Sequence, residues 1–259
     1  MSQLQLREFH SFEAAGQRFL YLVPSAAVFA LDDDGKLSGP PRLYANRGGG
    51  PVPDRQDGPH AHCVQFASDG SALYLVDLGS DEILRLDLAE DGALAAPQTA
   101  YRAPPGSGPR HLLFHPREPL AVLVSELAST LTVLQTGDGR LERLARHSLV
   151  PAGFAGETLG GHLALTNDGA RAYATNRGHD SIAVFALSAD GRADLAGHVP
   201  SGGAGPRHLL LLEDIGMLVV AHEDDGRVAA FRIGADGLPA PAGAGITVPG
   251  SCFVLRTSE

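Results

Sequence analysis

Short apolar runs separated by polar turns recur along this chain in a fixed order. In the clearest copy, residues 112–114 and 120–124 are apolar and are joined by the polar residues 115–118. Runs of this length, bounded by proline and charged residues, predict two antiparallel strands. The start of the first strand and the end of the second then lie at the same edge of a sheet. Arg110 and Glu126, which flank the two runs, are therefore expected at one edge.

The same pair of strands recurs four more times, and each pair is followed by a third apolar run and an Asp-Gly turn. The turn glycines, Gly35, Gly92, Gly139, Gly191 and Gly237, are 57, 47, 52 and 46 residues apart. This period is that of a four-stranded propeller blade. The sequence therefore predicts an all-β fold, a β-propeller of four-stranded antiparallel blades with five repeats in this chain.

The repeats predict a single domain over residues 1–259, because each blade buries its faces only against its neighbours. The connections 45–59 and 149–160 lack apolar periodicity, and insertions of this length in compact repeats are usually functional loops or tethers. We expect the first to fold over the rim, with a solvent linker as the alternative, and Phe154 to pack over the same rim. The blades are expected at about 1–45, 59–103, 108–149, 160–200 and 205–256.

The end of the chain predicts a closing strand at residues 252–256. Such a strand pairs with the first blade in many propellers and removes the exposed edges. Residues 7–12, however, already resemble the inner strand of the first blade. Either the first copy is irregular or closure is made differently.

Composition narrows the setting and the partners. The chain is 44% hydrophobic and has no apolar run of 18 residues, which predicts neither a membrane-spanning helix nor a signal core and favours the cytoplasm. Cys63 and Cys252 are expected as reduced, packed thiols, with a disulfide between them as the alternative. A net charge of −10 argues against nucleic acid and anionic membranes as partners. A small anion bound by a local group of arginines remains compatible with this charge.

In every repeat the start of the first strand and the end of the second lie at the same edge of the sheet, and we call the ring of these edges the rim. The sequence therefore predicts a ring of polar side chains at the mouth of a central channel, where ligands bind. An excess of buried arginine there favours an anion. The starts of the inner strands supply His60, His62, Arg110, His111, His162, Arg207 and His208, and the ends of the second strands supply Asp77, Glu126, Asn176, Arg177, His222 and Glu223.

Structural roles are the alternative for several of these residues. Arg207 and Glu223 can form an ion pair that holds blades together. His111 and His208 can cap backbone groups, and His179 with Asp180 can form a turn. The histidine spacing lacks a third ligand, so no metal and no cofactor are predicted. Motifs of serine or cysteine nucleophiles and phosphate-binding glycine loops are absent.

Seven segments together carry a family resemblance: PHAHCVQF, YLVDLGSDEI, GPRHLLFHP, VSELASTLTV, ATNRGHDSIAVF, GPRHLLLL and VPGSCFVL. They are similar to the lactonase family of β-propellers, which includes propeller-type 6-phosphogluconolactonases and fungal carboxymuconate lactonising enzymes. The resemblance implies a seven-bladed ring, of which about two N-terminal blades are missing here. A five-bladed ring, a ring completed by another subunit in a homo-oligomer, and a degenerate remnant are the alternatives. Ser125 departs from the family, which usually has Asn there.

The resemblance also implies a site of one histidine, two arginines and one glutamate, which fall on His60 or His62, Arg110, Arg177 and Glu126. The expected activity is hydrolysis of a small anionic sugar lactone, as in 6-phosphogluconolactonases. His60 or His62 is the expected base, with Glu126 to orient it or to shuttle the proton, and Arg110 to stabilise the oxyanion. A non-catalytic receptor for an anionic metabolite or a protein, and a muconate cycloisomerase, are the alternatives. Substrate contacts are expected from Arg177 and from Asp77, His111, Asn176, Arg207 and His208.

Overall fold

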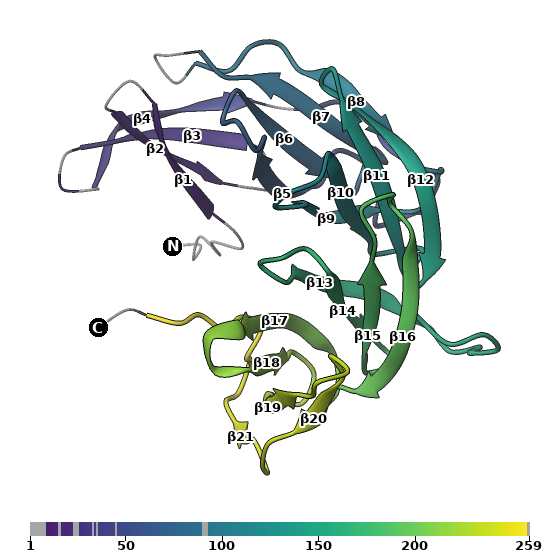
Figure 1. The fold of residues 1–259 in the computed structure, drawn as a ribbon. Coiled ribbons are helices and arrows are strands. Elements are labelled where there is room, and N and C mark those ends of the chain that lie inside the picture. The colour runs from purple at the N-terminus through teal and green to yellow at the C-terminus, as the bar shows by residue number, and fades with distance from the viewer. Residues whose placement is uncertain are drawn as a thin grey trace. The chain divides into compact units, whose positions relative to one another are not determined.

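The computed structural model describes residues 9–14, 17–22, 26–32, 34, 36–44, 46–89 and 93–257. Five sheets run in chain order, and Figure 1 shows them as successive groups of strands. The chain divides into two compact units, Met1–Leu112 with Asp138–Leu141, and Leu113–Gly137 with Glu142–Glu259. Each unit is described by itself below.

Each of the first two sheets is an antiparallel meander of four strands. The second sheet has both faces buried at its second strand, β6, where all six residues are buried. The strands of the first sheet are β1 (Phe9–Ala14), β2 (Gln17–Leu22), β3 (Ala26–Leu31) and β4 (Leu37–Tyr44). Those of the second are β5 (Ala61–Phe66), β6 (Ala72–Asp77), β7 (Glu82–Asp87) and β8 (Gln98–Arg102).

The third and fourth sheets repeat the same order, and β10 is as completely buried as β6. The third sheet consists of β9 (Pro109–Phe114), β10 (Leu120–Ser125), β11 (Thr130–Gly137) and β12 (Arg140–Ser148). The fourth consists of β13 (Leu159–Leu165), β14 (Arg171–Arg177), β15 (Ser181–Leu187) and β16 (Ala193–Pro200). At the turn between β11 and β12, Asp138 (φ 48°) and Gly139 (φ 75°) both have positive φ, as a tight hairpin turn requires.

The fifth sheet has a divided outer strand. Its inner strands are β17 (Pro206–Leu212), β18 (Met217–His222) and β19 (Arg227–Ile233), with the 3-10 turn η1 (Glu213–Ile215) between the first two. Two short strands, β20 (Pro239–Pro241) and β21 (Ile246–Thr247), both pair with β19. The all-β class and the four-stranded antiparallel blades predicted from the repeats are confirmed.

Apolar side chains pack between neighbouring sheets within the second unit. One cluster joins Val122 and Val133 of the third sheet to Ala174 and Phe185 of the fourth. A second cluster joins Tyr173 and the fourth sheet to the fifth. Since each blade relies on its neighbour to cover its face, these interfaces make up the core. Among the described residues, no helix has the length and apolar character needed to cross a membrane.

An aspartate in the left-handed conformation links one blade to the entry of the next. Asp180 (φ 52°) accepts a hydrogen bond from the Gly205 amide at 2.9 Å, and its backbone carbonyl accepts one from Ser201. Asp81 (φ 57°) does the same in the first unit, where it accepts from the Gly108 amide at 2.8 Å. Asp180 is thus the turn-former that the sequence suggested, and it also fixes the start of β17.

Residues 46–60 form an ordered loop over the end of the β5–β6 hairpin rather than a solvent linker. The Gln56 side chain is 1% exposed and donates a hydrogen bond to the carbonyl of Leu78 at 2.8 Å. A Cβ at Gly50 would overlap the Gln56 amide, so a larger residue there would displace this buried side chain. The Asn46 amide reaches Asp77 at 3.0 Å. These contacts fold the loop against the β5–β6 hairpin, and its place over a common rim stays a prediction.

The predicted closing strand is wrong. Residues 251–257 are assigned to no strand. Their polar groups instead reach the fifth sheet through side chains, since Ser251 donates to the His222 carbonyl and Arg256 pairs with Asp214. Cys252 is exposed, which corrects the expectation that it packs, whereas Cys63 is buried; both are free thiols. The pairing of residues 7–12 lies partly outside the described residues.

Candidate active site

The end of each second strand presents two kinds of position. Asp77, Asn176 and His222 are completely buried. Asp77 and His222 contact the backbone of their own blade, whereas Asn176 donates to the carbonyl of Leu149, which follows the third sheet. In the second unit, the residue that comes next after this buried position is charged. Glu126 follows Ser125, Arg177 follows Asn176, and Glu223 follows His222. Because successive side chains of a strand point to opposite sides, these charged residues lie on the other face.

Histidines gather in the first unit at the start of β5 and on β9. The ring of His62 lies 5.9 Å from that of His60 and 5.6 Å from that of His111, measured between centroids. His62 and His111 are buried, as is Arg110, which is 3% exposed. Asp77 accepts hydrogen bonds from the backbone amides of His60 and Ser80. The predicted residues of this unit are therefore close to one another, and Asp77 holds the entry to β5.

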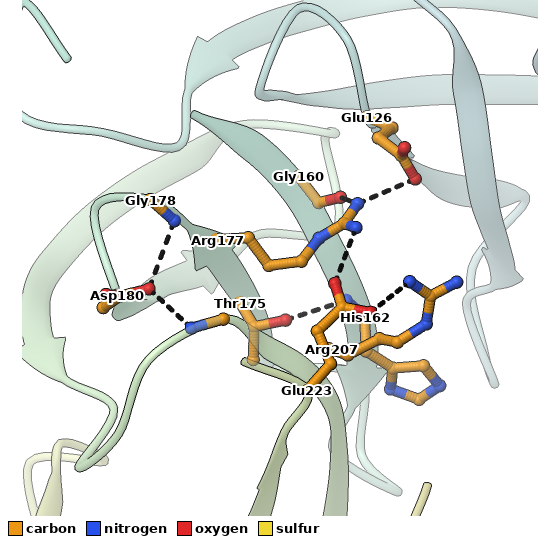
Figure 2. A network of polar contacts seen from close by, with 10 residues as sticks. Glu126, Gly160, His162, Thr175, Arg177, Gly178, Asp180, Arg207 and Glu223 are labelled. Atoms are coloured by element: carbon orange, nitrogen blue, oxygen red, sulfur yellow. Dashed lines mark hydrogen bonds and ion pairs between the residues drawn. The ribbon is translucent and has the colours of Figure 1, made fainter. Parts of the chain in front are cut away.

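Arg177 is the centre of a charged network in the second unit (Figure 2). Its Nη2 atom lies 2.8 Å from Glu126 Oε2 and donates to the Gly160 carbonyl at 3.1 Å. Its Nη1 atom donates to Glu223 Oε1 at 3.0 Å. The Arg177 and Glu126 side chains are only 10% and 3% exposed. The planar guanidinium is thus fixed on two edges by groups from three strand ends.

Glu223 bridges two arginines. Its other oxygen, Oε2, lies 2.6 Å from Arg207 Nη1, so one carboxylate pairs with guanidinium groups from β14 and β17. The ion pair between Arg207 and Glu223 that the sequence suggested is present. Burial raises the pKa of Glu223, but Arg207 and Arg177 more than offset this and hold the pKa below its usual range. Glu223 is therefore ionised at neutral pH.

Aromatic rings on β13, on β17 and in the C-terminal segment contact one another at tilted angles next to this network. The ring centroids of His162 and His208 are 4.0 Å apart, and those of His208 and Phe253 are 4.1 Å apart. Figure 2 shows His162 among the residues of the network, and its backbone amide donates to Thr175 Oγ1 at 2.8 Å. His208 is thus held against a ring from the C-terminal segment.

Phe154 packs against the turn after β14. Its ring meets the edge of His179 with centroids 4.7 Å apart, and His179 Nδ1 lies 2.7 Å from Ser181 Oγ. The loop between β12 and β13 therefore covers the turn that contains Asp180. Within the part of the chain that the structure describes, no three His, Cys, Asp or Glu side chains are arranged to hold a metal ion.

The structure brings together Glu126, Arg177 and Arg207 in one unit, and His60, His62, Arg110 and His111 in the other. A single rim for all of them stays a prediction. Sequence reasoning placed Glu223 on the rim but gave it no binding role, and it missed the carbonyl of Gly160 and the Asn46 side chain. The run His222-Glu223 after a strand is the signal that indicates Glu223. Nothing in the sequence marks a backbone carbonyl as a partner of Arg177.

Comparison with known proteins supports the family resemblance. Residues 20–256 match the model of the family described as lactonase, 7-bladed β-propeller. The chain is 33% identical over 208 residues to a protein from Bacillus subtilis named 6-phosphogluconolactonase. That match covers 79% of this chain and 59% of the Bacillus protein, so the chain spans little more than half the length of this relative.

Solved structures give the same result. A protein from Lactobacillus plantarum superposes with a TM-score of 0.86 at 28% identity, covering 93% of this chain and 71% of that one. A periplasmic gluconolactonase from Pseudomonas aeruginosa superposes with a TM-score of 0.82 at 30% identity, covering 91% and 68%. On the family match, the repeated sheets and these superpositions, the chain belongs to the lactonase family of seven-bladed β-propellers.

Proposed function

We propose that this protein hydrolyses a sugar lactone and that the substrate carries a negative charge, as a 6-phosphogluconolactone does. The observation that carries the proposal is the pair of arginines, Arg177 and Arg207, held by Glu126 and Glu223 on consecutive strand ends. Guanidinium groups bind phosphate and carboxylate through two parallel hydrogen bonds. Membership of the lactonase family and the similarity to the Bacillus protein supply the reaction class.

Lactone hydrolysis needs three chemical tasks. Water must be activated against the ester carbonyl, the oxyanion must be stabilised, and the leaving alkoxide must receive a proton. We assign the first task to His60 or His62, because an imidazole titrates near neutral pH. The imidazolium formed when this histidine takes the proton from water would pass that proton to the leaving alkoxide. Arg110 is assigned to the oxyanion, since its planar donors match a developing negative oxygen.

The second unit supplies the anion-binding role in this proposal. Arg177 and Arg207 would contact the phosphate or carboxylate of the substrate. Glu126, which the sequence assigned to orienting the base, contacts Arg177 at 2.8 Å. Its proposed role is therefore to hold that guanidinium in a fixed plane. Glu223 remains ionised at neutral pH, which makes it unsuitable as the acid that protonates the leaving group.

The test is an assay of 6-phosphogluconolactone hydrolysis, in which the acid released is measured over time. A mildly acidic pH keeps the uncatalysed hydrolysis by hydroxide slow. Arg110→Gln should lower turnover at least ~100-fold, the range found when a donor to an oxyanion is removed. Arg232→Gln is the control, because Arg232 is exposed on β19. Thermal melting of each variant establishes that it is folded.

Two outcomes would contradict the proposal. A protein that binds 6-phosphogluconate but hydrolyses no sugar lactone would be a receptor for an anionic metabolite. A protein that is inactive on sugar lactones but converts a muconate to its lactone would be a cycloisomerase. Unchanged turnover in Arg110→Gln would refute the role of Arg110 while leaving the reaction class intact.

A further inference from the structure

The contact between Glu223 and Arg207 occupies the position that an anionic ligand would take. Glu223 Oε2 lies 2.6 Å from Arg207 Nη1, and Glu223 Oε1 lies 3.0 Å from Arg177 Nη1. A phosphate or carboxylate of a ligand would present its oxygens to the same two guanidinium groups. The carboxylate of Glu223 therefore has the chemistry and the placement of a bound anion.

The two carboxylates of the network differ in how firmly they are held. Glu126 is 3% exposed and contacts Arg177, which also donates to the Gly160 carbonyl. Glu223 is 27% exposed, and Arg207 is 21% exposed. Within the described part of the chain, Glu223 is the ion-pair partner of Arg207. Solvent thus reaches the Arg207–Glu223 pair more readily than the Arg177–Glu126 pair.

Charge balance decides what an incoming anion must do. Arg177 and Arg207 carry two positive charges, and Glu126 and Glu223 carry two negative ones, so the network is neutral. An anion that approached Arg207 with Glu223 in place would meet a like charge in a partly desolvated site, where such an encounter is costly. Binding is favourable only if the Glu223 carboxylate moves away from Arg207.

We propose that Glu223 is an internal counter-ion of Arg207, and that a ligand bearing a phosphate or carboxylate binds by displacing it. Arg177 keeps its position during the exchange, because Glu126 and Gly160 hold its other edge. This inference rests on the proposed function in one respect only: the proposed function suggests that the part of the ligand beyond its phosphate or carboxylate is a sugar.

Displacement has a measurable consequence for anion affinity. Glu223 competes with the ligand at neutral pH, because it is ionised there. Glu223→Gln keeps the shape and the hydrogen-bonding atoms but removes the competing charge. The network then carries one net positive charge. The variant should bind inorganic phosphate about tenfold more tightly than the unchanged protein, on the order of the coupling of one close charge pair.

The experiment is calorimetric titration of the full chain with inorganic phosphate and with 6-phosphogluconate, at low and at high salt. Glu223→Gln should gain affinity for both ligands, and the gain should shrink at high salt because the charge is screened. Arg207→Gln should bind both ligands at least ~10-fold more weakly. The double variant Arg207→Gln with Glu223→Gln should recover little of this affinity. Asp214→Asn is the matched control, since it removes a carboxylate from the exposed pair with Arg256. Phosphate should also raise the melting temperature of Glu223→Gln more than that of the unchanged protein.

The inference is overturned if folded Glu223→Gln binds phosphate no more tightly than the unchanged protein, or if neither binds it. It is also overturned if Asp214→Asn gains as much, because the effect would then be one of net charge. The two proposals fail separately. Tighter phosphate binding without lactone hydrolysis would keep the counter-ion and reject the lactonase. Lactone hydrolysis without a gain in the phosphate affinity of Glu223→Gln would keep the lactonase and reject the counter-ion.

Discussion

Replacing Arg177 by methionine tests whether the charged network also stabilises the fold. The guanidinium contacts Glu126 at 2.8 Å, Glu223 at 3.0 Å and the Gly160 carbonyl at 3.1 Å, and only 10% of the side chain is exposed. Methionine fills similar space but leaves the 3% exposed Glu126 without this positive charge. Removing one partner of a buried ion pair costs roughly 3–5 kcal/mol. Because Glu223 is partly solvated, we expect about 3 kcal/mol.

Thermal and urea denaturation measure this loss. A loss of about 3 kcal/mol corresponds to a fall in melting temperature of roughly 6–12 °C for a domain of this size. Arg192→Met is the control, because its pair with Asp194 is mostly exposed and should contribute at most about 1 kcal/mol. The double variant Arg177→Met with Glu126→Gln should recover about half of the loss, since it removes the buried carboxylate as well. A single variant within about 1 kcal/mol of the unchanged protein would refute the reasoning, as would a double variant no more stable than the single one.

Two further predictions concern stability. Arg207 and Arg177 hold the pKa of Glu223 below its ordinary value of 4.5, so the stability that its charge contributes is present above that value and is lost as the pH falls through the folded pKa. Glu223→Gln should therefore be less stable than the unchanged protein near pH 7, and the difference should narrow below pH 4.5 in denaturation at several pH values; a difference that widens in acid would contradict this. Gly153 (φ 87°) and Gly178 (φ 86°) share a left-handed backbone, but a Cβ on Gly153 would meet open space, whereas one on Gly178 would overlap the Glu157 carbonyl. In urea denaturation, Gly153→Ala should lower the free energy of unfolding by about 1–2 kcal/mol, and Gly178→Ala should lower it clearly more. Equal losses in the two variants would contradict this, because they would mean that the backbone moves to relieve the overlap with the Glu157 carbonyl.

The repeat pattern predicted most of the fold because the blade is a local structure. Its strands are neighbours in sequence, and apolar runs and Asp-Gly turns specify each hairpin without reference to distant residues. The strands begin earlier than the apolar runs do: β9 starts at Pro109 and β17 at Pro206. The polar residues at the starts of these strands belong to the sheet through hydrogen bonds of their backbone atoms. The hydropathy of a side chain gives no information about such bonds.

Residues 252–256 show where local pattern fails. The segment is mostly apolar, as a buried strand requires, but a strand also needs a partner edge. The described residues offer it side-chain and backbone groups of the fifth sheet instead, and Phe253 packs on His208. Whether an apolar run pairs depends on which edge lies beside it, and that is not encoded in the run itself.

The composition of the candidate site followed from the sequence, whereas its pairing did not. Strand order and the hairpin rule selected Arg110, Glu126, Arg177 and Arg207, because the period of two along a strand and the turn lengths are local properties. Only the tertiary structure decided that Glu223 bridges Arg177 and Arg207, and that the Asp77 and Asn176 side chains are completely buried. Ion pairs between blades depend on the angle and distance at which sheets pack, and these are set by side chains far apart in the chain.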